Sequence, residues 1–146
     1  MSLGEDLYKE IILEHASNPR RRGCVATATH SHVGFNPLCG DEVELQIEVR
    51  DGIIQDIRFQ GEGCSISQAS ASMLTEEVVG KSLEQVQHLG ESFKAWMKDR
   101  AMSEPPEEIG DLEALAGVRL YPVRIKCALL PWTTMAEALK PQPSVG

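Results

Sequence analysis

The chain has 146 residues, 42% of them hydrophobic and 25% charged, which is the profile of one soluble globular domain with a single core. Fourteen Lys and Arg against 22 Asp and Glu give a net charge of −8, which argues against a nucleic-acid-binding protein, since phosphate binding needs a basic face. No apolar run reaches the roughly 20 residues that span a bilayer, and the N-terminus lacks the order of a secretory signal. We therefore expect a cytoplasmic protein that binds neither nucleic acid nor membrane.

The N-terminal part of the chain predicts one helix and three strands. Hydrophobic residues at helical spacing indicate an amphipathic helix over residues 3–16. A weak strand pattern follows over residues 25–35. In residues 42–50 apolar and polar side chains alternate completely, which predicts a strand with one buried face. After an Asp51-Gly52 turn, residues 53–60 predict the partner strand of a hairpin.

The register of this hairpin can be predicted by matching its apolar faces. A three-residue loop over residues 50–52, with a glycine bulge at its end, places Leu45 opposite Ile57. Continued outward, the same ladder brings Cys39 opposite Gly63. Three residues are then expected to converge at the open end of the hairpin: Cys39, Asp41 and Cys64.

The rest of the chain predicts helices only. In order, we expect a helix from Ser65 or Ser67 to Gly80, a short helix from Ser82 to Gly90, another around Phe93 to Met97, a surface loop over 103–111, a helix over 112–116 and a last helix over 122–139. Ser82 and Gln85 form a capping box. Pro131 predicts that the last helix kinks there or begins near Ala128.

This order of elements predicts an α+β fold, in which helices pack on one face of a small three-stranded antiparallel sheet. We expect residues 1–146 to form a single domain, with residues 141–146 as a disordered tail. The chain shows no internal repeat.

Four cysteines are spread along the chain, and a reducing cytosol argues against disulfides between them. Cys39 and Cys64 each lie in a turn that contains glycine, and Cys127 lies in the predicted last helix. Asp41 follows Cys39 by two residues. Three thiolates and one carboxylate complete a tetrahedral ligand set for zinc or iron. The alternative is that these cysteines are small core residues. The predicted ligands are Cys39, Asp41, Cys64 and Cys127.

Cys24 differs from the other three cysteines. It lies among small residues with no companion acid, so we expect it to be a spectator. A rival metal site would combine Cys24 with His30 and His32, because a His-x-His pair on a strand points both rings to one face. Alternating His and Thr in a weak strand is more typical of a solvent-facing surface.

Three motifs follow one another along the chain: Asn36-Pro-Leu-Cys-Gly-Asp41, Gly61-Glu-Gly-Cys-Ser-Ile-Ser67-Gln-Ala-Ser70, and Arg124-Ile-Lys-Cys-Ala128 with Trp132. Together they resemble the signatures of the U-type iron–sulfur cluster assembly proteins, a family that includes IscU, SufU and the NifU N-terminal domain. The resemblance is closer to the SufU branch, because Lys126 stands where the IscU branch has a histidine and residues 80–120 resemble the longer SufU insertion. It implies a SufE/NifU-like fold with Cys39, Asp41, Cys64 and Cys127 at one site.

The resemblance also implies a function in iron–sulfur cluster assembly. Such a protein binds a metal ion or a nascent [2Fe–2S] or [4Fe–4S] cluster, accepts persulfide sulfur from a SufS-like cysteine desulfurase, and passes its product to apoproteins or carrier proteins. Scaffold and zinc-dependent sulfurtransferase are overlapping descriptions of this role, and we expect zinc in the purified protein. Lys126 is expected to lower the pKa of Cys127 and to make that thiol the sulfur acceptor. We expect a monomer or a weak homo-oligomer.

A structural zinc-binding interaction module without sulfur-transfer activity is the alternative from another class. Structural zinc sites are usually closed sets of cysteine and histidine, so an aspartate ligand counts against it. A cognate desulfurase would release sulfide at the same rate with or without such a module.

Overall fold

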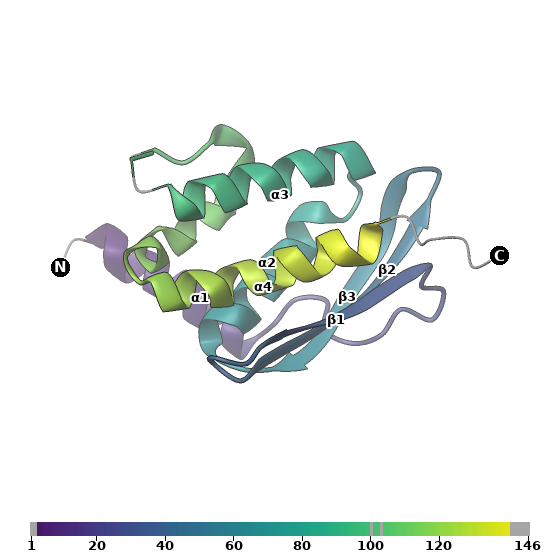
Figure 1. Cartoon of the computed structure of the whole chain (residues 1–146), viewed down its shortest axis with the longest axis horizontal. Coiled ribbons are helices and arrows are strands. Elements are labelled where there is room, and N and C mark those ends of the chain that lie inside the picture. The colour runs from purple at the N-terminus through teal and green to yellow at the C-terminus, as the bar shows by residue number, and fades with distance from the viewer. Residues whose placement is uncertain (1–2, 100, 103, 141–146) are drawn as a thin grey trace.

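A three-stranded antiparallel sheet in the order β1–β2–β3 and a layer of helices make up the fold (Figure 1). The computed structural model describes residues 3–99, 101–102 and 104–140, so the predicted tail lies outside the described residues. None of the described helices is long and apolar enough to cross a membrane. The predicted α+β class is confirmed. Its elements are α1 (Leu3–Ser17), β1 (His30–Asn36), β2 (Asp41–Arg50), β3 (Ile53–Glu62), α2 (Ser65–Val78), α3 (Leu83–Lys98), the 3-10 helix η1 (Glu107–Leu120) and α4 (Pro122–Leu139).

The hairpin of β2 and β3 supplies the sheet's share of the core. Every second residue of β2 from Asp41 to Ile47 is buried, as the alternation predicts, and burying one large apolar side chain such as Leu45 contributes about 1.5–3 kcal/mol. β1 is shorter than the predicted strand, since it begins at His30 rather than near residue 25. The sheet residues with no exposed surface are Val43, Leu45, Ile47, Ile54, Ile57 and Phe59.

The predicted register of this hairpin is wrong. The loop has two residues rather than three, because Asp51 (φ 55°) and Gly52 (φ 72°) both adopt the left-handed conformation of a tight hairpin turn. Leu45 pairs with Phe59 and not with Ile57. Next to the turn the ladder is displaced by one residue from the expected one, and from Glu48 outward it is displaced by two.

An extra residue in β3 restores the match between the two apolar faces. Glu48 pairs with Asp56 while the next residue, Val49, pairs with Ile54, so that Gln55 has no partner in the ladder. Such a bulge shifts the side-chain alternation by one residue. A three-residue loop and a two-residue loop with a bulge both align the apolar faces, and hydrophobic matching alone could not choose between them.

The helices on either side of Gly90 form one continuous helix, α3, rather than the two that the sequence predicts. A Cβ atom built on Gly90 would lie 3.7 Å from Cε3 of Trp132 on α4, so this glycine lies where two helices approach each other. The capping box of Ser82 and Gln85 at the start of α3 is confirmed. Part of the predicted surface loop before residue 111 is also helical, because η1 begins at Glu107.

The last helix, α4, lies along β1 and carries Cys127 to the end of the sheet (Figure 1). It runs from Pro122 to Leu139, as the sequence predicts, and continues through Pro131, so of the two alternatives at that proline the start near Ala128 is wrong. The contact with β1 is close at Gly34, where an added Cβ would lie 2.0 Å from Oγ1 of Thr134. A larger residue at Gly34 would therefore push α4, and with it Cys127, away from the sheet.

Candidate metal centre

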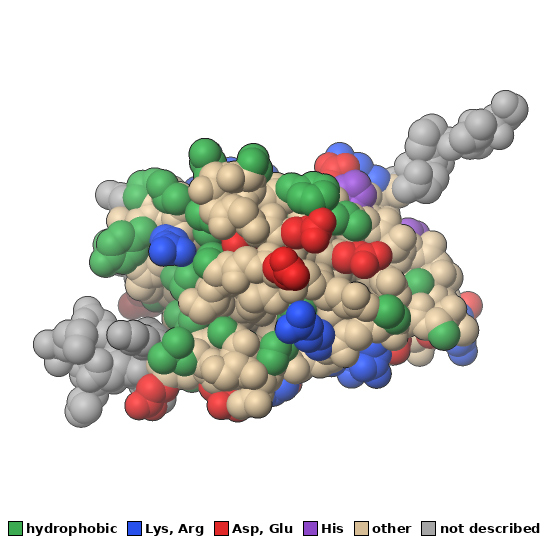
Figure 2. All heavy atoms as spheres, turned by 90° about the horizontal axis from the view of Figure 1, so that it is seen from below, with side chains coloured by type: hydrophobic (Ala, Val, Ile, Leu, Met, Phe, Trp, Pro, Cys, Tyr) green, Lys and Arg blue, Asp and Glu red, His purple; other side chains and the backbone are tan. Residues whose placement is uncertain are grey.

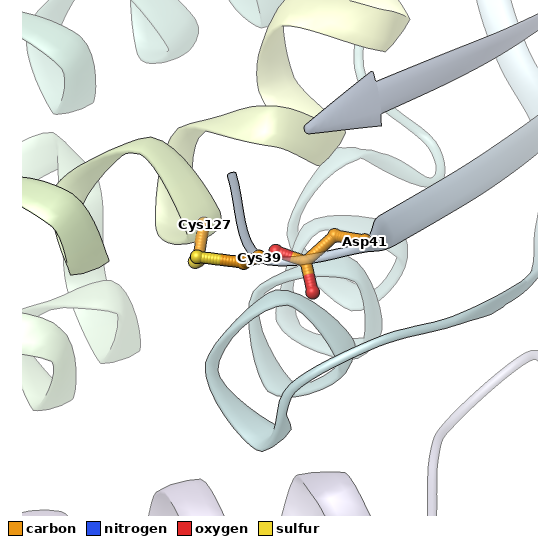
Figure 3. A group of neighbouring side chains, drawn as sticks. All are labelled: Cys39, Asp41 and Cys127. Carbon is orange, nitrogen blue, oxygen red and sulfur yellow. The ribbon is translucent and has the colours of Figure 1, made fainter. Parts of the chain in front are cut away.

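Two thiols and one carboxylate meet where the loop between β1 and β2 faces α4 (Figure 3). Cys39 comes from this loop, Asp41 is the first residue of β2, and Cys127 lies on α4. Each offers one ligand atom, and these atoms all lie within 4.8 Å of one another. The Sγ atoms of Cys39 and Cys127 are 3.2 Å apart, and both cysteines are free.

Cys64 lies beside this group of three and contacts it through Asp41. The backbone N–H of Cys64 donates to Asp41 Oδ1 at 2.8 Å, and its Sγ lies 3.8 Å from Asp41 Oδ2. Cys64 is also the N-cap of α2, a position that the sequence assigned to Ser65 or Ser67. The structure therefore brings the four predicted residues together, with Cys64 outside the tightest group of three.

A glycine makes room for the carboxylate of Asp41. Gly63 has φ 150°, and a Cβ built there would lie 2.2 Å from Asp41 Oδ1. Because of the two-residue shift in register, Asp41 and not Cys39 lies against this glycine. Asp41 is only 2% exposed, and a buried carboxylate needs compensating partners. The backbone N–H of Cys64 donates to this carboxylate, and a metal cation would supply the positive charge that compensates it. The donor set of three sulfurs and one oxygen fits zinc or iron.

Burial controls the chemistry of Cys127. Its side chain has no exposed surface, and this burial, together with hydrogen bonds to Cys39, Asp41 and Cys64, raises the pKa of the Cys127 thiol far above its ordinary value. Lys126 is exposed and does not offset the desolvation. The expectation that Lys126 lowers this pKa is therefore wrong.

Asn36 is a residue of the site that the sequence analysis did not single out. It is 7% exposed, and its Nδ2 donates to Cys127 Sγ at 3.7 Å. The Asn36-Pro37 pair reads as a turn, which is a sufficient reason for an asparagine at this position. The hydrogen bond to Cys127, which lies 91 positions later in the chain, gives the Asn36 side chain a second role that the sequence does not reveal.

The rival site around Cys24 does not form. Cys24 is exposed, and its Sγ accepts a hydrogen bond from Gln60 Nε2 at 2.6 Å. His32 is exposed, and the ring of His30 contacts Thr29 Oγ1. Within the part of the chain that the structure describes, the Cys39, Asp41 and Cys127 group is the one cluster of at least three His, Cys, Asp or Glu side chains close enough to hold a metal.

Exposed hydrophobic side chains lie next to the thiols in the sequence and in space. Leu38 precedes Cys39, and the carbonyl of Val123 contacts Cys127 Sγ at 3.8 Å. In Figure 2 hydrophobic side chains gather toward the left end of the molecule, the end at which α4 begins. Four hydrophobic side chains at the end of β1, in the loop that follows it and at the start of α4 are each more than half exposed, and we call them the apolar rim: Phe35, Leu38, Tyr121 and Val123.

The family described as the NifU-like N terminal domain matches residues 7–128. The chain belongs to this family. It is 37% identical over 135 residues to the zinc-dependent sulfurtransferase SufU of Bacillus subtilis, a match that covers 92% of this chain and 90% of that protein. It is also 37% identical over 134 residues to the iron-sulfur cluster assembly scaffold protein IscU of Thermotoga maritima, covering 92% of this chain and 93% of that protein.

Solved structures of NifU-like proteins have the same fold. A putative iron-sulfur cluster assembly scaffold protein for the SUF system from Fervidobacterium islandicum superposes with a TM-score of 0.84 at 33% identity, over 93% of this chain and 98% of that chain. An N-terminal NifU-like protein from Brucella abortus gives a TM-score of 0.82 at 26% identity, over 94% and 95%. The resemblance that the three motifs indicate is confirmed. Because the SufU and IscU relatives are equally identical to this chain, overall identity does not separate the two branches.

Proposed function

We propose that this protein serves iron–sulfur cluster assembly in the SufU manner, by holding a metal ion at one site and accepting persulfide sulfur there from a cysteine desulfurase. The observation that carries this proposal is the convergence of Cys39, Asp41 and Cys127 within 4.8 Å, with Cys64 against the carboxylate. The described functions of its NifU-like relatives, a zinc-dependent sulfurtransferase and a cluster assembly scaffold, support it. The cluster, whether [2Fe–2S] or [4Fe–4S], is cargo that passes on to apoproteins or carrier proteins.

The four residues would hold zinc in the resting protein. Bound zinc would keep the thiols as thiolates, which counteracts the raised pKa of Cys127. Asp41 is the one hard oxygen donor among soft sulfurs. A mixed set of this kind suits a site that must exchange its contents, whereas a permanent structural site favours cysteine and histidine alone.

We propose Cys127 as the sulfur acceptor, with bound zinc, rather than Lys126, as the charge that would keep its thiol ionised. The Cys127 thiolate attacks the outer sulfur of the desulfurase persulfide, the bond between the two donor sulfurs breaks, and a new S–S bond forms at Cys127 Sγ. The desulfurase cysteine leaves as a thiolate. The transferred sulfur keeps its proton and its oxidation state, so the step needs no oxidant or reductant.

A persulfide can reach Cys127 only if the loop between β1 and β2 moves. Cys39 lies 3.2 Å away on the loop between β1 and β2, and the side chain of Cys127 has no exposed surface. Leu38, on the same loop, belongs to the apolar rim. A desulfurase that docks on the rim would therefore contact the loop that has to move before its persulfide can reach Cys127.

The test is to incubate the protein with a cognate desulfurase and cysteine, measure sulfide release, and map the extra sulfur by mass spectrometry. We expect faster sulfide release and a persulfide on Cys127. Cys127→Ser should abolish the acceleration, whereas Cys24→Ser, the matched control at an exposed thiol, should retain it. Persulfide on Cys39 or Cys64 with Cys127 unmodified would contradict the acceptor assignment. An unchanged rate of sulfide release would favour the structural zinc module instead.

A further inference from the structure

Asn36 contacts every member of the group of three ligand residues. As the last residue of β1 it pairs with Asp41 across the β1–β2 ladder. Its backbone carbonyl accepts a hydrogen bond from the N–H of Cys39 at 3.2 Å, and its Nδ2 donates to Cys127 Sγ at 3.7 Å. The side chain is buried, so this amide donates to the sulfur away from competing water.

The bond to Cys127 is the one that spans the fold. Cys39 and Asp41 are two positions apart in the chain, whereas Cys127 reaches them from α4, 91 positions after Asn36. Small changes in how α4 packs on β1 therefore move Cys127 relative to the other ligands. The Asn36 amide connects β1 directly to the Cys127 sulfur, and not merely to the backbone of α4.

We propose that Asn36 is a positioning residue that holds Cys127 Sγ beside Cys39 and Asp41 and so determines how long the site retains its metal. This inference rests on the proposed function, because it takes these residues as ligands. Groups that hydrogen-bond to a metal ligand fix its orientation, and their loss typically costs 10–100-fold in metal affinity. A hydrogen bond to a sulfur that carries negative charge is also stronger than one to a neutral acceptor.

A purely structural role for Asn36 makes different predictions. The turn uses the backbone carbonyl of Asn36 and the ring of Pro37, and both survive replacement of the amide. Asn36→Leu keeps the approximate shape of the side chain and removes its donor. Thr133→Val is the control, because Thr133 lies on the exposed side of α4 and its hydroxyl donates to the backbone carbonyl of Leu129 at 3.1 Å.

The first measurement needs no substitution. Cadmium-113 would be bound to the nitrogen-15-labelled full chain, and proton–cadmium correlation spectra would be recorded. A coupling carried through the hydrogen bond should connect the Asn36 side-chain amide to the metal through Cys127 Sγ. Assignment is simple, since the chain has only two asparagines, and the other, Asn18, is exposed.

The outcomes separate this inference from the proposed function. A cadmium shift typical of several sulfur ligands without coupling to Asn36 would overturn the positioning role and leave the proposed function intact. A cadmium shift without sulfur ligation would overturn both. In the substituted proteins we expect zinc transfer to excess chelator to be about 10–100-fold faster for Asn36→Leu and unchanged for Thr133→Val. Equal rates for the wild type and Asn36→Leu would also overturn the positioning role.

Discussion

The two ends of the β2–β3 hairpin are built by different means. At the closed end, two adjacent residues in the left-handed conformation, Asp51 and Gly52, join the strands. At the open end, Asp41 meets Cys64 across 23 positions of the chain, and Cys39 meets Cys127 across 88. Local turn chemistry thus forms one end, and tertiary packing assembles the other. Changes at the closed end should therefore alter stability alone, and changes at the open end should alter metal binding as well.

The largest effect is expected from Gly63→Ala at the open end. The new Cβ would lie 2.2 Å from Asp41 Oδ1 and the backbone would keep a strained φ, so the carboxylate must move. We expect a loss of about 1–3 kcal/mol in the free energy of unfolding and at least about tenfold weaker zinc binding. Urea titration and competition with a chromophoric chelator measure the two quantities. Unchanged zinc affinity would break the proposed link between Gly63 and the site.

Metal removal should also act through the open end. Metal bound at Cys39, Asp41, Cys64 and Cys127 would tie the hairpin to α4, and a ligand bound only by the folded state stabilises that state. We expect the melting temperature to fall by roughly 10 °C when a chelator removes zinc. The check is differential scanning fluorimetry, with metal loss confirmed by elemental analysis and Cys24→Ser as the control. An unchanged melting temperature would show that the helices and sheet hold together without this tie.

The smallest effect is expected from Asp51→Ala at the closed end. Alanine tolerates the left-handed conformation less well than aspartate, which can hydrogen-bond locally. The free energy of unfolding should fall by about 0.5–1 kcal/mol in urea titrations, with the zinc affinity of the folded protein unchanged. A change in zinc affinity would mean that the two ends are coupled through the ladder.

The fold could be predicted from the sequence where patterns are regular, and not where two solutions give the same pattern. Strong alternation in β2 and the capping box of α3 located both elements. The register failed because Gln55, the bulged residue, leaves no mark in the hydrophobic pattern. Gly90 was read as a helix end because glycine often ends helices, yet it lies in the middle of α3 against Trp132.

The sequence predicted which residues form the candidate site but not how buried they are or which groups they contact. Glycine and proline around Cys39 and Cys64, together with an acid at Asp41, marked the residues that the fold brings together. The raised pKa of Cys127 was missed because burial depends on how α4 packs, which a neighbouring Lys126 does not reveal. Asn36 was missed for the same reason, since its donor role requires a contact between distant segments.

The central claim is that one metal joins the open end of the hairpin to α4 through four residues. Zinc X-ray absorption of the purified full chain tests it most directly. We predict three sulfurs at about 2.3 Å and one oxygen at about 2.0–2.2 Å, with one sulfur lost in Cys127→Ser. Scattering from two or more histidine rings, or a spectrum that Cys127→Ser leaves unchanged, would contradict the account.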